Sequence, residues 1–69
     1  MNIYSIILQE INDSYYTIMK TYKDRDTANA CILDVVDKLK TDNHKVKGID
    51  GSYIVDGAYV IRIMCHVAL

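Results

Sequence analysis

The sequence predicts an α+β domain with the order ββαββ, in which one helix packs on one face of a four-stranded antiparallel sheet. Three observations predict this fold. Residues 58–67 form the longest apolar run and are rich in β-branched side chains, as in a central strand. Residues 24–40 repeat apolar side chains with helical spacing. Asp56-Gly57 lies between two apolar runs and indicates a tight hairpin. The 69 residues are expected to form a single domain, 1–69.

The first two strands are predicted over residues 3–9 and 15–22. Register follows from matching apolar rows, because a slip of one residue would turn every side chain to the opposite face. The best match places Ile6 opposite Ile18. It leaves residues 11–13 as a three-residue hairpin loop.

A helix is expected to begin after Tyr22 and to end near Lys40. Asp24 is the expected N-cap, because its carboxylate can accept hydrogen bonds from the free N–H groups of the first turn. An apolar stripe should face the sheet, with Cys31 at its edge, and it comprises Ala28, Ile32, Val35, Val36 and Leu39. The opposite, solvent-facing side carries Ala30, Leu33, Asp34 and Asp37.

The third strand is predicted to begin at His44, with a bulge or bend where Gly48 and Asp50-Gly51 interrupt it. Asp56-Gly57 then predicts a two-residue type I′ turn into the fourth strand. Alternation along that strand predicts an inward-facing apolar row of Tyr59, Ile61, Ile63, Cys65 and Val67.

The sheet face that the helix leaves uncovered is the expected interaction surface. A solvated face of an antiparallel sheet should be mostly polar, whereas this one carries many large apolar side chains. Contiguous apolar patches usually mark interaction sites, although scattered surface hydrophobes are the simpler alternative. Six residues are predicted to bind a partner: Tyr15, Met19, Tyr53, Arg62, Met64 and His66. The same face is expected to include Ile3, Ile7, Thr17, Thr21, Val55 and Val60.

Composition argues against several functional classes. A net charge of −1 gives no general attraction to nucleic acid or to an anionic membrane. No apolar run reaches the ~18 residues of a membrane span. Because residues 1–4 do not begin a signal peptide, we expect a cytoplasmic protein with reduced thiols. Cys31 and Cys65 are predicted to be unpaired core thiols, since they lie on the inward stripe and row.

No catalytic, metal-binding or cofactor-binding residue is predicted. Cys65 and His66 are adjacent on a strand and so point to opposite faces, and no Cys-x-x-Cys spacing supports zinc. The chain has no glycine-rich phosphate loop and no nucleophile elbow. We therefore expect a protein that is not an enzyme.

Small size favours self-association. A chain of 69 residues buries only roughly 60% of its unfolded surface, so a partner subunit would add needed stability. We predict a homodimer at micromolar concentration, held by the uncovered sheet face and by the apolar C-terminal residues 67–69.

The whole pattern resembles small accessory proteins of bacteriophages. The resemblance is carried by a short hairpin, an Asp-capped helix start Asp24-Arg25-Asp26-Thr27-Ala28 and a closing hairpin. Such proteins commonly bind and block a host protein, as anti-CRISPR, antirestriction and antitoxin proteins do. The resemblance implies an inhibitor of a host protein that works by surface occlusion.

Two other functions stay open. A nucleic-acid-binding regulator could use the basic residues of 38–47, with Tyr15 and Tyr53 as stacking platforms. An oligomer could instead sequester a small nucleotide signal. The first predicts steeply salt-dependent binding to nucleic acid, and the second predicts thermal stabilisation by a nucleotide.

Overall fold

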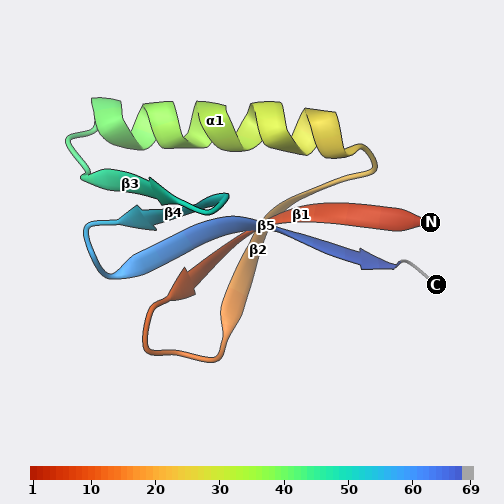
Figure 1. Cartoon of the computed structure of the whole chain (residues 1–69), viewed down its shortest axis with the longest axis horizontal. Helices are drawn as coiled ribbons and strands as arrows, with labels where there is room; N and C mark the ends of the chain where they lie inside the picture. Colours follow the sequence, from red (N-terminus) through yellow and green to blue (C-terminus); the bar gives the residue numbers. More distant parts are fainter. Residues whose placement is uncertain (68–69) are drawn as a thin grey trace.

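One helix lies along one side of a five-stranded antiparallel sheet in a computed structural model, which describes residues 1–67 (Figure 1). The sheet order is β2-β1-β5-β4-β3. The elements are β1 (Asn2–Glu10), β2 (Tyr16–Tyr22), α1 (Arg25–Thr41), β3 (Val46–Ile49), β4 (Ser52–Val55) and β5 (Tyr59–Val67). The α+β class, with one helix on an antiparallel sheet, is confirmed, while the predicted number of four strands is wrong.

The fifth strand arises because the predicted bulge is a hairpin turn. Ile49 pairs with Ser52, so that Asp50 and Gly51 form a two-residue loop between β3 and β4. Their φ angles are 49° and 81°, and positive φ at both central residues defines a type I′ turn. The predicted third strand is therefore two short strands, β3 and β4, joined at the Asp-Gly pair that had been interpreted as an irregularity.

The hairpin at Asp56-Gly57 is confirmed, but its loop is one residue longer than predicted. Val55 pairs with Tyr59, which places Ala58 in the loop as well. The Ala58 N–H donates to the Val55 carbonyl at 3.0 Å, and Asp56 and Gly57 both have positive φ. The added residue shifts the register of β4 against β5 by one. Each side chain of β4 therefore lies on the opposite face of the sheet from the one predicted.

The predicted register between β1 and β2 is also wrong. Ile6 lies opposite Lys20, and Ile7 lies opposite Ile18. Met19 is an extra residue between these two pairs and forms a β-bulge. At a bulge, two successive residues of one strand lie opposite one residue of the other strand. The alternation of faces along β2 therefore does not continue through Met19.

The helix begins and ends close to the predicted residues. Asp24 is confirmed as the N-cap, because its Oδ2 accepts hydrogen bonds from the Thr27 backbone N–H and the Thr27 hydroxyl, both at 2.9 Å. The last helical residue is Thr41, one position after Lys40. Its solvent-facing side is exposed as predicted, and its fully buried residues are Ala28, Ile32 and Val36.

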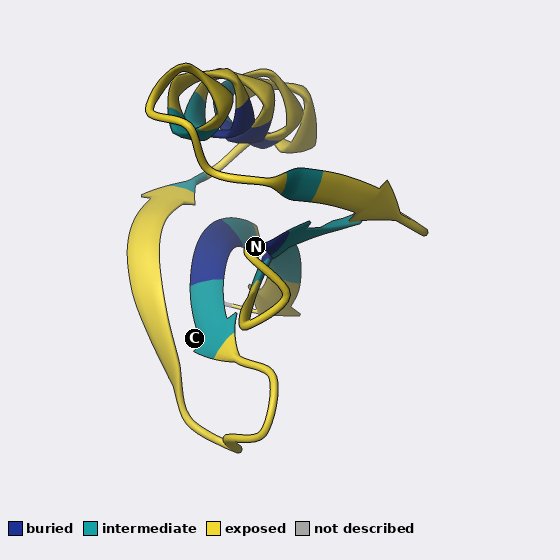
Figure 2. Cartoon of the chain, turned by 90° about the vertical axis from the view of Figure 1, so that its left-hand side faces the viewer, coloured by how far each residue is buried: buried dark blue, intermediate teal, exposed yellow. Residues whose placement is uncertain are grey.

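The core lies between α1 and the middle of the sheet. Figure 2 shows buried residues on the side of the helix that faces the sheet and in the strand beneath it, while β2 is exposed along nearly its whole length. The central cluster consists of Ile6, Ile32, Val55 and Ile61. Eight partly buried side chains pack around it: Leu8, Tyr22, Cys31, Val35, Leu39, Val46, Tyr53 and Ile63.

The prediction that Cys65 is a core thiol is wrong. Cys31 is partly buried at the edge of the core, but Cys65 is exposed. Cys65 pairs with Tyr4 and so shares the helix-facing side of the sheet with Ile61 and Ile63. Alternation therefore predicted its face correctly, but the last residues of β5 extend beyond the buried centre.

Candidate functional site

The uncovered sheet face is the side of the sheet opposite α1. Cross-strand partners share a face, so the pairing of β1 with β5 and β2 defines its members. Arg62 lies opposite Ile7, Met64 opposite Ser5, and His66 opposite Ile3. The face comprises Ile3, Ser5, Ile7 and Gln9 of β1, Tyr16, Ile18 and Thr21 of β2, Lys47 and Ile49 of β3, Ser52 and Ile54 of β4, and Val60, Arg62, Met64 and His66 of β5.

Three of the six predicted partner-binding residues lie on this face. Arg62, Met64 and His66 project from β5 in the predicted order. Whether they bind a partner stays a prediction.

The other three predicted residues lie elsewhere. Tyr15 precedes β2 in a loop, 82% exposed, where its N–H is bound to Asp13 Oδ1 at 3.1 Å. Met19 sits at the bulge and lines a pocket on the helix side. Tyr53 pairs with Ile61 and packs against the core, because the β4–β5 loop has three residues. The same slip moves Val55 from the uncovered face into the core.

A buried polar group lies at the centre of the uncovered face. Ser5 and Ile7 are fully buried, although both point away from the helix. The Ser5 hydroxyl is hydrogen-bonded to Thr21 Oγ1 at 3.2 Å and to His66 Nε2 at 3.0 Å. This bonding satisfies the serine and fixes the orientation of His66 on the face.

Sequence reasoning missed the contribution of β2 to the uncovered face. Ile18 is 51% exposed and Tyr16 is 46% exposed. They lie on this face because Ile18 pairs with Ile7 and Tyr16 with Gln9. Simple alternation along β2 would place both on the helix-facing side of the sheet, together with Tyr22. The pattern holds no clear signal for the bulge that moves them, since Met19 is not a residue that marks one.

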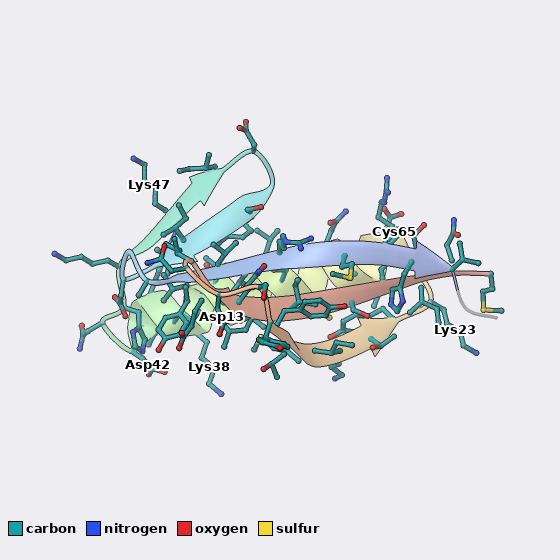
Figure 3. All side chains as sticks on the ribbon, turned by 90° about the horizontal axis from the view of Figure 1, so that it is seen from below. Asp13, Lys23, Lys38, Asp42, Lys47 and Cys65 are labelled. Carbon is teal, nitrogen blue, oxygen red and sulfur yellow. The ribbon has the colours of Figure 1, made fainter. Side chains whose placement is uncertain are left out.

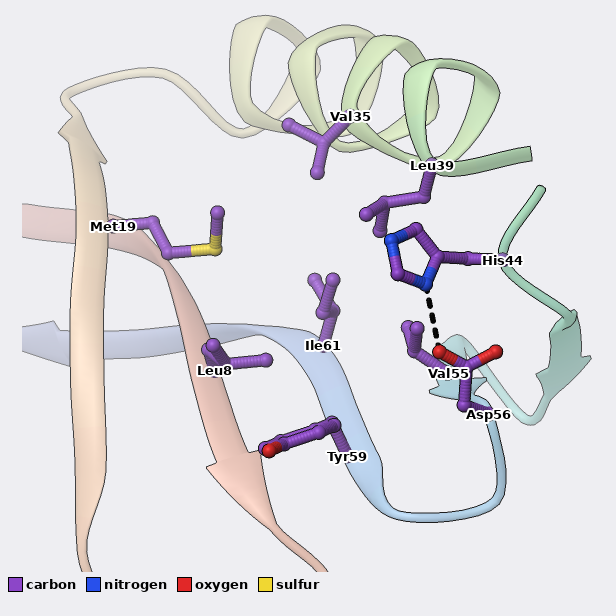
Figure 4. Close-up of a pocket in the computed structure, with 9 residues that line it drawn as sticks. All are labelled: Leu8, Met19, Val35, Leu39, His44, Val55, Asp56, Tyr59 and Ile61. Carbon is purple, nitrogen blue, oxygen red and sulfur yellow. Dashed lines mark hydrogen bonds and ion pairs between the residues drawn. The ribbon is translucent and has the colours of Figure 1, made fainter. Parts of the chain in front are cut away.

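A pocket opens on the opposite side of the sheet, between α1 and the strands (Figure 4). Its volume is about 200 Å³. Seven of its lining side chains are apolar or aromatic: Leu8, Met19, Val35, Leu39, Val55, Tyr59 and Ile61. The other two, His44 and Asp56, form a hydrogen-bonded pair at one side.

Asp56 ties the start of β3 to the β4–β5 loop. Its Oδ2 lies 2.7 Å from His44 Nδ1, and its Oδ1 accepts from the Lys45 backbone N–H at 2.9 Å. These hydrogen bonds, from His44 first and Lys45 second, hold the pKa of the Asp56 carboxyl below its ordinary value. A carboxylate only accepts, so Nδ1 carries a proton, and in the neutral form of the ring Nε2 is left as an acceptor. Figure 4 shows Nε2 on the side of the ring that faces Leu39 and the pocket.

The basic residues near the helix end do not form one strip. Lys38 and Lys47 point in opposite directions, and Asp42 lies near Lys38 (Figure 3). Tyr53, expected as a stacking platform, is packed against the core. The arrangement therefore offers little support for nucleic-acid binding.

Within residues 1–67, no three His, Cys, Asp or Glu side chains gather so that they could hold a metal ion. In the same part of the chain, the helix is too short and too polar to cross a membrane.

Comparison of the chain with protein-family models, with curated proteins and with solved structures found no match.

Proposed function

We propose that this chain is a non-enzymatic protein-binding module that covers a functional surface of its partner, as a phage-type inhibitor of a host protein does. The observation that carries the proposal is the chemistry of the uncovered sheet face. A sheet face left to water should be mostly polar, yet eight of the fifteen side chains named for this face are apolar or aromatic, and its polar members include Arg62 and His66.

The distribution of exposure on this face supports binding. Ile18 and Tyr16 stand out from β2, while Arg62 and Met64 are partly buried beside the closed centre at Ile7. Aromatic, arginine and large apolar residues gathered on one face are typical of the anchors that dominate protein interfaces. We therefore propose Tyr16, Ile18, Arg62, Met64 and His66 as the partner-binding residues.

The same face supports a homodimer, in which case a host protein that binds this face would take the place of the second copy of the chain. A self-complementary apolar patch can serve a two-fold symmetric pair of identical chains. Residues 67–69 were predicted to contribute to the dimer interface, and of these Val67 is exposed at the end of β5. Residues 68–69 lie outside the described part of the chain. A cytoplasmic location in a host cell goes with this proposal.

Affinity capture with paired variants tests the proposed function. The immobilised natural chain, the double variant Ile18→Ala/Arg62→Ala and the control Leu33→Ala are each exposed to a bacterial lysate. Captured proteins are identified and quantified by mass spectrometry. We expect one host protein to be retained in stoichiometric amounts by the natural chain and by Leu33→Ala, and to be lost with the double variant. Equal retention by all three chains would contradict the assigned face.

Leu33 is a suitable control because it is an apolar residue with the same 51% exposure as Ile18, but on the outer side of α1. The two substitutions remove similar exposed apolar area from opposite sides of the molecule. A difference in capture therefore reports the position of the binding surface rather than a general loss of hydrophobic surface.

A further inference from the structure

We propose that the pocket between α1 and the sheet receives a single aromatic side chain that carries a hydrogen-bond donor, tyrosine or tryptophan, from a partner protein. This inference rests on the proposed function, because it names the chemistry of one partner residue. It concerns a different surface, on the opposite side of the sheet from Arg62 and Ile18.

The volume of the pocket matches one ring. An apolar cavity of about 150 Å³ is large enough to bind benzene, whereas pockets for drug-sized ligands span about 300–1,000 Å³. At about 200 Å³, this pocket has room for one ring and little more. The interior is apolar, with Leu8 and Ile61 on the sheet and Val35 and Leu39 on the helix.

The pocket is open to a side chain from outside. Met19, which lines it from the edge strand β2, is 46% exposed, and Tyr59 on the opposite side is also exposed. A ring attached to another protein backbone can therefore enter without displacing a core residue. Hot-spot anchors in protein interfaces are enriched in tyrosine and tryptophan that fill such pockets.

His44 supplies the polar selectivity. In the neutral form of the ring, Asp56 holds the proton on Nδ1, and Nε2 offers a lone pair toward the pocket. A phenylalanine ring offers no donor, so Nε2, which belongs to a side chain that is 43% exposed, would keep only its bond to water. The tyrosine O–H or the tryptophan N–H would replace that water. The geometry thus favours a ring with a donor over a ring without one.

Side-chain analogues test the pocket directly. The natural chain is titrated with p-cresol, which represents tyrosine, and with toluene, which represents phenylalanine, while amide and methyl shifts are followed by NMR. We expect saturable shifts at Leu8, Val35, Leu39 and Ile61 with p-cresol. The substitution His44→Asn removes the ε nitrogen but keeps an amide that can bind Asp56. It should lower the ratio of p-cresol affinity to toluene affinity about tenfold, the equivalent of one hydrogen bond.

Two blocking variants control for the site. Val35→Phe fills the pocket from the helix and should abolish the shifts, and Met19→Phe narrows its entrance and should weaken them if the first variant folds poorly. Leu33→Ala should leave the titration unchanged. Absence of saturable shifts in the folded natural chain, or an affinity ratio unchanged by His44→Asn, would overturn the proposal.

A tyrosine peptide identifies the source of the ring. Acetyl-Gly-Tyr-Gly-amide should shift the same pocket residues as p-cresol if the ring comes from a protein. Binding of p-cresol without binding of the peptide would contradict a partner side chain and indicate a free small molecule. These titrations need no captured partner, so their failure is distinguishable from failure of the uncovered sheet face to bind one.

Discussion

Ile7 and Ile18 lie opposite each other on β1 and β2, yet Ile7 is fully buried while Ile18 is 51% exposed. Both point away from the helix, so burial on this face does not come from α1. The centre of the uncovered face is closed to water at Ser5 and Ile7, and its edge at β2 stays open. This combination of a dry centre and an exposed apolar edge distinguishes the face from an ordinary solvated sheet surface.

Ile61 should be the most sensitive core position of β5. It is almost completely buried and belongs to the central cluster with Ile6, Ile32 and Val55. Ile61→Ala should lower the free energy of unfolding by roughly 2–5 kcal/mol, measured by urea denaturation, because it removes buried methyl groups and leaves a cavity. Leu33→Ala should change it by less than about 0.5 kcal/mol. Similar losses for both variants would contradict the described core.

The two cysteines should react at different rates. Cys65 is exposed, whereas Cys31 is partly buried against the core. In the native protein, Ellman's reagent should modify Cys65 promptly and Cys31 more slowly, and unfolding in denaturant should make the two rates similar. Cys65→Ala should remove the fast phase with little loss of stability. A native chain in which Cys31 reacts first would refute this assignment.

Asp24 should contribute to the acid sensitivity of the fold. Its hydrogen bonds to the Thr27 N–H and hydroxyl hold the pKa of its carboxyl below the ordinary value of 3.8. Because this pKa is lower in the folded state, the stabilisation is present above about pH 4 and is lost as pH falls through the folded pKa.

Asp24→Asn provides the matched test, since asparagine is an equally good N-cap that does not titrate. Unfolding by urea should show similar stability for both chains near neutral pH. As the pH falls below about 4, the natural chain should lose stability more steeply than Asp24→Asn. If stability depended on pH with the same slope in the two chains, Asp24 would not contribute to the acid sensitivity of the fold.

Self-association should be visible at micromolar concentration. Sedimentation velocity should show a dimer of the natural chain that shifts toward monomer when Ile18 is replaced by a charged residue, such as Ile18→Glu. Leu33→Glu should leave the dimer unchanged. A folded monomer that persists to high concentration would exclude the homodimer and leave the uncovered face for a different protein.

The sequence predicted the elements of the fold better than their registers. The helix with its Asp24 cap follows from local rules, because capping and the apolar stripe involve neighbouring residues. Registers depend on loop lengths and bulges. The three-residue loop after Val55 and the bulge at Met19 each invert a row of side chains, and neither leaves a clear mark in the pattern.

These registers decided which site residues were predicted correctly. Arg62, Met64 and His66 lie on one uninterrupted strand, so simple alternation placed them on the uncovered face. Tyr53 precedes the three-residue loop between β4 and β5, and Met19 lies at the bulge in β2. Both were therefore assigned to the wrong face. The His44–Asp56 pair could not be found, because it forms only once the unpredicted β3–β4 hairpin brings residues 44 and 56 together.

The most direct measurement of the central claim is the dissociation constant of the captured partner for Arg62→Ala and for Leu33→Ala, determined by calorimetry. If the uncovered sheet face binds the partner and Arg62 is an anchor, Arg62→Ala should weaken binding by about 2 kcal/mol or more, roughly 30-fold. Leu33→Ala should bind as the natural chain does, and both variants should remain folded. Loss of binding in Leu33→Ala, with Arg62→Ala unaffected, would show that the outer side of α1 is the binding surface instead.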